Sequence, residues 1–210
     1  MRARANNVLE PLLAATLIEQ SSDNLARRGW AYEGFWRITR PVALSPGKFA
    51  REHLMLSCNG GGAMIAVLGT ARLRLNGYAV LFENQLFLFA AEREDSNLAF
   101  GILNLVSRLK AEVLDGLVLT RHGDSSGSPV AMRMLLERVG DLTGDDEDDM
   151  AKFEALCSQS ALLPPEAVPE NVRKHLCPDF GPTAFANGGE LLLTMHVAQS
   201  MSRGTLVDGA

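Results

Sequence analysis

Cysteine is scarce in this 210-residue chain, and the three residues present, Cys58, Cys157 and Cys177, are not regularly spaced. An odd, irregular set argues against a disulfide scaffold and agrees with a reducing compartment. Long apolar runs are also missing, since none approaches the roughly 20 residues that span a bilayer. Polar residues and a proline between positions 6 and 11 interrupt the apolar core that a signal peptide needs. We therefore expect a cytoplasmic protein with no membrane partner.

Positive charge is also in short supply. The net charge is −5 and the isoelectric point is near 5.4, whereas binding to phosphate backbones needs a basic footprint. The N-terminal region has no room for a helix-turn-helix module. The sequence therefore predicts no direct nucleic-acid binding. A local basic group, Arg37, Arg40, Lys48 and Arg51, is interpreted as solvated surface charge.

Complete catalytic and metal-binding sets are not evident. His175 and Cys177 lie close together, with Cys157 and His196 as remote companions, but no second pair has the spacing of zinc ligands. The acidic tract 141–149 lacks the alternating ligands of a calcium loop and fits a linker or helix cap. The glycine cluster 59–62 runs into a strand rather than a helix, which favours a hairpin loop over a phosphate site. We expect no metal and no cofactor.

A hydrolase is one alternative that stays open. The loop 122–129 holds His122, Asp124 and Ser125, and its Gly-Asp-Ser-Ser-Gly-Ser-Pro segment is similar to the Gly-Asp-Ser-Gly-Gly-Pro motif of chymotrypsin-like hydrolases. In those enzymes the histidine and aspartate lie far upstream on a double barrel. Catalysis here requires these groups, with or without His53, to converge within hydrogen-bond reach.

Short apolar segments with a turn signal about every ten residues organise the stretch from Gly62 to Val139. This spacing is typical of an antiparallel β-meander. Asn76-Gly77 is flanked by apolar-patterned runs, the usual signature of a two-residue hairpin turn. The expected strands are 49–58, 63–68, 71–75, 78–82, 85–89, 98–103, 113–119 and 130–138, with helix as the alternative for the last.

An amphipathic helix is expected over 7–28, with a break at Ser21-Ser22-Asp23, because apolar residues recur at three- and four-residue spacing. An aromatic strand follows over 32–39. Short helices near 149–158 and 172–176 and a last strand over 190–197 complete the chain. We expect an α+β fold, a curved and partly closed antiparallel meander with an N-terminal helix and a small helical C-terminal annex. The predicted units are 1–140, 141–200 packing on the same domain, and a tail, 201–210.

Aromatic side chains on the strands suggest a ligand site. On the first strand Tyr32 and Trp36 share a face, where they either pack in the core or line a pocket. We predict a non-enzymatic sensor or interaction domain that binds a small apolar or aromatic effector on the concave face of the sheet. The alternative is a structural homodimer in which the edge strand 63–68 pairs with its copy. The candidate ligand-binding residues are Tyr32, Trp36, Tyr78, Phe87 and Asn104.

Two resemblances bear on function. One set of short motifs covers about half the chain: Tyr32-x-Gly34-x-Trp36-Arg37, Tyr78, Leu86-Phe-Leu88, Ile102-Leu-Asn104, Leu114-Asp-Gly-Leu117, Pro129-Val-Ala-x-Arg133 and Leu136-Glu-Arg138. This set resembles the C-terminal regulatory region of certain proteobacterial helix-turn-helix regulators, which implies signal sensing or assembly of a regulator. Gly34-Phe35-Trp36, on the first strand after a helix, is similar to the Gly-x-Trp of lipocalin-type barrels, which implies an eight-stranded meander around a small apolar ligand.

Overall fold

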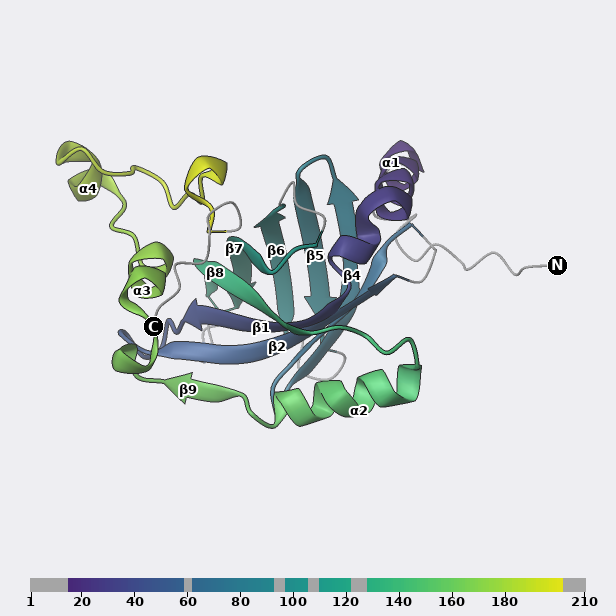
Figure 1. The fold of residues 1–210 in the computed structure, drawn as a ribbon. Coiled ribbons are helices and arrows are strands. Elements are labelled where there is room, and N and C mark those ends of the chain that lie inside the picture. The colour runs from purple at the N-terminus through teal and green to yellow at the C-terminus, as the bar shows by residue number, and fades with distance from the viewer. Residues whose placement is uncertain (1–14, 59–61, 93–96, 106–109, 122–127, 202–210) are drawn as a thin grey trace.

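The computed structural model describes residues 15–58, 62–92, 97–105, 110–121 and 128–201. Within these residues, nine strands form one antiparallel sheet, and eight of them close into a barrel because β1 pairs with both β2 and β8 (Figure 1). The predicted antiparallel meander is confirmed, and its closure is complete. The barrel strands are β1 (Gly34–Pro41), β2 (Phe49–Cys58), β3 (Met64–Gly69), β4 (Arg74–Phe82), β5 (Gln85–Ala91), β6 (Leu98–Asn104), β7 (Val113–Arg121) and β8 (Pro129–Gly140).

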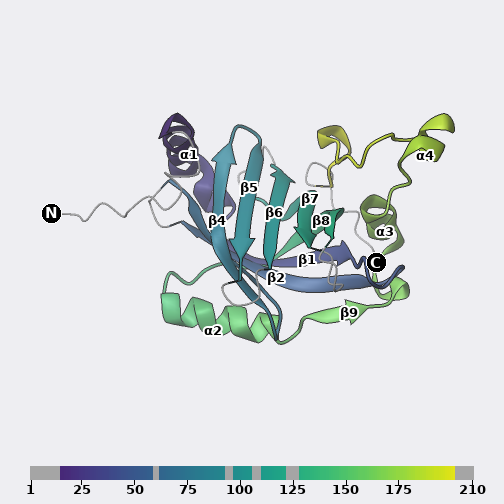
Figure 2. The same cartoon turned by 180° about the vertical axis from the view of Figure 1, so that it is seen from behind.

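Alternation along each strand separates the inside of the barrel from the outside. On β1, Trp36 and Ile38 point into the main apolar core, whereas Phe35 belongs to a separate cluster outside the wall. Each strand pairs with its neighbour in sequence, so the connections alternate between the two ends of the barrel. We call the end that carries the β1–β2 and β3–β4 connections the mouth, and the other the closed end. Figure 2 shows β4, β5 and β6 side by side from behind.

The hairpin turn predicted at Asn76-Gly77 is wrong. Both residues lie inside β4, where they pair with Val67 and Ala66 of β3. The turn lies earlier, because the Thr70 side-chain oxygen accepts hydrogen bonds from the backbone N–H groups of residues 72 and 73. With the turn there, β4 pairs with β3 over residues 74–79 and with β5 over residues 76–82, and these ladders outweigh the local turn preference of Asn-Gly.

Helix α1 (Ala15–Arg28) packs across the outside of β4 near the closed end. The Ser21 hydroxyl accepts a hydrogen bond from the Leu81 N–H at 3.1 Å, and the Asn24 amide donates to the Leu81 carbonyl at 3.1 Å. These contacts hold the helix through the serine-rich segment, so the predicted break is wrong. The earlier part of the predicted helix lies outside the described residues.

Helix α2 (Asp146–Cys157) covers the outside of β1, β2 and β3 with Phe153 (Figure 1). Asp145 caps it by accepting from the backbone N–H groups of Glu147 and Asp148, both at 3.0 Å. The acidic tract is thus the cap and first turn of a helix, as expected, although the helix begins three residues earlier than predicted. None of the helices in the described ranges is long and apolar enough to cross a membrane.

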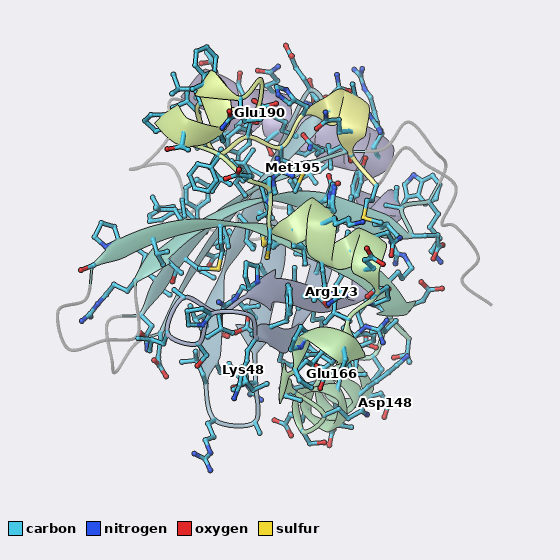
Figure 3. All side chains as sticks on the ribbon, turned by 90° about the vertical axis from the view of Figure 1, so that its left-hand side faces the viewer. Lys48, Asp148, Glu166, Arg173, Glu190 and Met195 are labelled. Carbon is cyan, nitrogen blue, oxygen red and sulfur yellow. The ribbon has the colours of Figure 1, made fainter. Side chains whose placement is uncertain are left out.

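The last strand predicted at 190–197 is not formed, and Glu190 makes only an isolated bridge with Phe180. The barrel strands that this segment contacts, β6, β7 and β8, are each paired on both sides and offer it no free edge. Its backbone carbonyls are bound by side chains from the barrel wall instead. In Figure 3, Glu190 and Met195 lie on this segment, and Lys48 of the β1–β2 connection lies far below them. The C-terminal elements are β9 (Ala161–Leu163), η2 (Pro165–Ala167), α3 (Glu170–Leu176), α4 (Pro182–Ala186) and η3 (Val197–Gln199).

The segment 63–68, proposed as the edge strand of a homodimer, does not lie at a sheet edge. Met64–Gly69 pairs with β2 on one side and with β4 on the other, so its backbone groups are used within the barrel. Strand β9 extends the sheet by pairing with the first residues of β2. The division of the chain at residue 140 stays a prediction.

Candidate functional site

A buried arginine and tryptophan fill the closed end of the barrel. The Arg138 guanidinium lies 4.5 Å from the centre of the Trp36 ring and donates to the backbone carbonyls of Ala31, Glu33 and Ala111. The Trp36 indole N–H donates to the Tyr32 carbonyl at 3.0 Å. These bonds satisfy the buried polar atoms and leave this end solid.

Gly34 is required at this end because of the arginine. Its φ is +136°, a region that favours glycine. A Cβ atom there would also lie 2.5 Å from an Arg138 nitrogen and 2.6 Å from the Gly140 carbonyl oxygen. The first residue of the Gly-x-Trp segment therefore makes room for the guanidinium that closes the barrel.

The mouth, by contrast, opens into a cavity of about 280 Å³ inside the barrel. Most of its wall is aliphatic or methionine, which suits a small apolar molecule. The lining residues are Ile38, Arg40, Val42, Ala43, Leu44, Glu52, Leu68, Gly69, Thr70, Leu73, Leu75, Leu88, Asn97, Ala99, Val118, Thr120, Arg121, Val130, Met132 and Met134.

An ion pair is embedded in this apolar wall. Arg40 on β1 donates two hydrogen bonds to Glu52 on β2, from Nε to Oε2 at 2.9 Å and from Nη2 to Oε1 at 2.6 Å. The side chains are only 23% and 14% exposed. Burial lowers the pKa of Arg40, but the charge and hydrogen bonds of Glu52 outweigh it and raise the pKa overall, so the guanidinium stays charged. The interpretation of Arg40 as solvated surface charge is therefore wrong.

The third nitrogen of Arg40 has a much weaker partner. Nη1 donates to the Met132 sulfur at 3.5 Å, and a thioether is a weak acceptor. Arg40 and Met132 both line the cavity. Glu52 thus holds the Arg40 guanidinium in place with Nη1 directed at the cavity wall. An oxygen atom of a ligand in the cavity is a better acceptor for this N–H group than the sulfur.

The five candidate ligand residues do not share one face, and none of them is among the described residues that line this cavity. Tyr32 and Trp36 are fully buried in the core at the closed end. Tyr78 and Phe87 point outward into the cluster beneath α1. Asn104 is buried on the outside beneath the C-terminal segment, where its amide donates to Asp115 and to the Met195 carbonyl, both at 3.3 Å. Their role in binding stays a prediction.

Asp115 is the centre of this outer cluster. Its carboxylate is 0% exposed and accepts four hydrogen bonds from described residues: Asn104 Nδ2 at 3.3 Å, His175 Nε2 at 2.9 Å, Ser200 Oγ at 2.6 Å and Met201 N at 2.7 Å. The carboxylate lies between the histidine and the serine, whereas nucleophilic catalysis needs the histidine in the middle. The cluster therefore fastens the C-terminal segment to the barrel.

Arg133, next to Asp115 on the outer wall, completes the attachment. Its guanidinium donates to the Thr194 carbonyl at 2.7 Å and to the His175 carbonyl at 2.8 Å. Figure 3 shows the attached segment lying across the strands beside α3. Asp115 on β7 and Arg133 on β8 thus hold the C-terminal segment through side-chain hydrogen bonds, in place of the backbone ladder of the predicted last strand.

The proposed hydrolase residues are not seen together. His122, Asp124 and Ser125 lie outside the described residues. His53 faces outward from β2 with its ring Nδ1 3.3 Å from the Ser160 hydroxyl. Burial, followed by the charges of Arg37 and Arg51, lowers the pKa of His53, so it is neutral at pH 7. Across the described ranges, no group of three His, Cys, Asp or Glu side chains gathers as metal ligands.

The sequence did contain a signal for Arg40 and Glu52. Arg40 continues the period-two face of Trp36 and Ile38, and Glu52 stands on the face of Leu54 and Leu56. Each charge therefore falls at an inward position. Grouping Arg40 with Arg37 and Arg51, which are at outward positions, hides this signal and favours the interpretation as surface charge.

Comparisons with known protein families, with curated proteins and with solved structures gave no match.

Proposed function

We propose that this protein is a non-enzymatic sensor or carrier that binds a small, mainly apolar molecule inside the mouth of its barrel. The single observation that supports it is the 280 Å³ cavity inside the mouth, which lies beside the buried core around Trp36. A site of this kind is a concave apolar pocket with few polar groups that orient the ligand. Arg40, Glu52 and Arg121 are the charged groups in the described lining.

A pair of inward substitutions tests the proposal. We expect Val118→Phe combined with Val130→Phe to fill the cavity, since both side chains line it from adjacent strands. The matched control is Leu119→Phe with Ala131→Phe, the paired outward neighbours on the same strands. Native mass spectrometry of the proteins purified from cell extract should show added small-molecule mass on the wild type and the control. Occupancy should fall at least tenfold in the inward variant.

Thermal unfolding of both variants checks that the inward pair still folds. A wild-type spectrum without added mass contradicts the proposal. Equal retention of the ligand by the inward and outward variants contradicts it as well, because the cavity is then not the site.

Homodimerisation is the second candidate function. Phe100 and Ile102 of β6 and Leu119 of β7 project outward, with 38%, 43% and 48% of their surface exposed. Strands β6 and β7 are adjacent (Figure 2). Because Phe100 is paired with Leu119, these side chains form one apolar row on the barrel exterior. Rows of this kind mark contact surfaces, and two copies related by a two-fold axis cover the same row on each other. The native mass spectrum also counts subunits, and a monomer at high concentration contradicts this candidate.

A further inference from the structure

The polar groups of the cavity differ in how well they are satisfied. Glu52 accepts two short, charge-assisted hydrogen bonds from Arg40, so its carboxylate is engaged. Arg40 Nη1 is left with the Met132 sulfur at 3.5 Å as its acceptor among the described residues. A buried guanidinium N–H gains most when a weak acceptor is replaced by an oxygen. The cavity thus offers a fixed donor.

The charges around the cavity point the same way. Its described lining holds two arginines, Arg40 and Arg121, against one carboxylate, Glu52. The chain as a whole carries a net charge of −5, so the excess of positive charge here is local. Arg40 is paired with Glu52, so the excess is the charge of Arg121, which is exposed at the rim of the mouth. A solvent-exposed charge is screened, so it adds only a small attraction for a negatively charged group, and the buried Arg40 donor carries the preference.

We propose that the ligand is a small aliphatic or aromatic acid whose anionic oxygen accepts from Arg40 Nη1 while its apolar body fills the space between Leu75, Leu88 and Met134. This inference rests on the proposed function and adds the chemical class of the ligand. Glu52 has a positioning role, because its two hydrogen bonds fix the guanidinium plane and leave Nη1 directed at the cavity. An alcohol offers Nη1 a neutral acceptor, and a primary ammonium offers it none.

Three probes with the same apolar tail separate these cases. Octanoate, octanol and octylamine are titrated into the wild-type protein at pH 7 by isothermal titration calorimetry, which compares an anionic, a neutral and a cationic head group directly. We expect octanoate to bind at least tenfold more tightly than octanol, and octylamine to bind most weakly. This comparison uses the unmodified protein and does not depend on whether any variant folds.

Two variants place the preference at the ion pair. Arg40→Met leaves Glu52 without its partner, so the double variant Arg40→Met/Glu52→Leu is measured beside it. The double variant should keep octanol affinity and lose the preference for octanoate. Arg72→Met is the control, because Arg72 is exposed on the β3–β4 turn and is outside the described lining. It should bind all three probes as the wild type does.

The outcomes separate the two proposals. Octanol binding as tightly as octanoate, or octylamine binding most tightly, overturns the acid while the cavity remains a ligand site. An octanoate preference that persists in the double variant overturns the role of Arg40. No binding of any of the three probes contradicts the proposed function itself, and this inference falls with it.

Discussion

Replacing Asp115 with Asn is expected to lower the free energy of unfolding by about 3 kcal/mol, since a buried charged acceptor contributes roughly 1.5 to 3 kcal/mol and donors left unsatisfied add to the cost. Each carboxylate oxygen accepts two hydrogen bonds. In either orientation the Asn amide places its NH₂ group against two donors. The C-terminal segment then loses its main attachment to the barrel.

Acid should reduce the difference in the free energy of unfolding between the wild type and Asp115→Asn. Burial raises the pKa of Asp115, but hydrogen bonds from His175, Ser200, Met201 N–H and Asn104 outweigh it and lower the pKa below the ordinary value of 3.8. A carboxylate with a lowered folded pKa contributes stability that is fully present above its unfolded pKa. That contribution is lost as the pH falls through the folded pKa, because the unfolded chain takes up the proton first. Below about pH 4 the stability of the wild type should approach that of the variant.

Urea unfolding at a series of pH values measures the effect, and Asp179→Asn is the control because Asp179 is exposed and loses the same charge. Hydrogen exchange over 190–201 should accelerate in Asp115→Asn and stay unchanged in the control. Equal stability of the two variants at pH 7 would show that Asp115 does not hold the segment.

Gly77→Ala is expected to destabilise the protein by about 3 kcal/mol, the upper end of the roughly 1 to 3 kcal/mol that overpacking typically costs. A Cβ atom at Gly77 would lie 1.7 Å from the Phe89 carbonyl oxygen, an overlap that only movement of β4 or β5 can relieve. The glycine lets the backbones of β4 and β5 approach closely at this point. This expected loss of stability comes from the packing of β4 against β5 and does not depend on a turn at Asn76-Gly77.

Asn76→Ala provides the matched control, since Asn76 is exposed on the same strand. We expect it to change stability by no more than about 0.5 kcal/mol, as is usual at surface positions. If residues 76 and 77 formed a type I′ turn, Asn76→Ala would instead be costly, because that turn needs positive φ at both positions. Chemical unfolding of the two variants side by side distinguishes the strand from the turn.

Much of the fold was readable from the sequence because its signals are local. Period-two alternation and regular turn signals predicted the meander, and the acidic run before Phe153 predicted the cap of α2. Closure of the barrel was less accessible, since it depends on β1 pairing with β8 about 100 residues away. The position of the first tight hairpin was mispredicted for the same reason: pairing across β3 and β5 outweighed the Asn-Gly preference.

The site was harder to predict than the fold. Aromatic rings often line ligand pockets, which favours aromatic residues as candidates for ligand binding. In the structure, however, Trp36 fills the closed end and Phe87 lies outside the barrel under α1. The cavity is lined mainly by aliphatic residues and methionine, which look like core in any sequence. Only an inward charge such as Arg40 distinguishes a cavity wall from a solid core, and its direction becomes certain once strand register is known.

Methyl NMR of the methionines tests most directly whether the barrel mouth is the ligand site. Met132 and Met134 line the cavity, whereas Met55 on the outside of β2 and Met150 on α2 belong to the cluster between the wall and that helix. On addition of octanoate we expect the Met132 and Met134 methyl signals to shift in a saturable manner and to show contacts with the ligand tail, while those of Met55 and Met150 stay in place. Shifts confined to Met55 and Met150, or no saturable shift in any of the four with octanoate, octanol or octylamine, would contradict a ligand site inside the barrel.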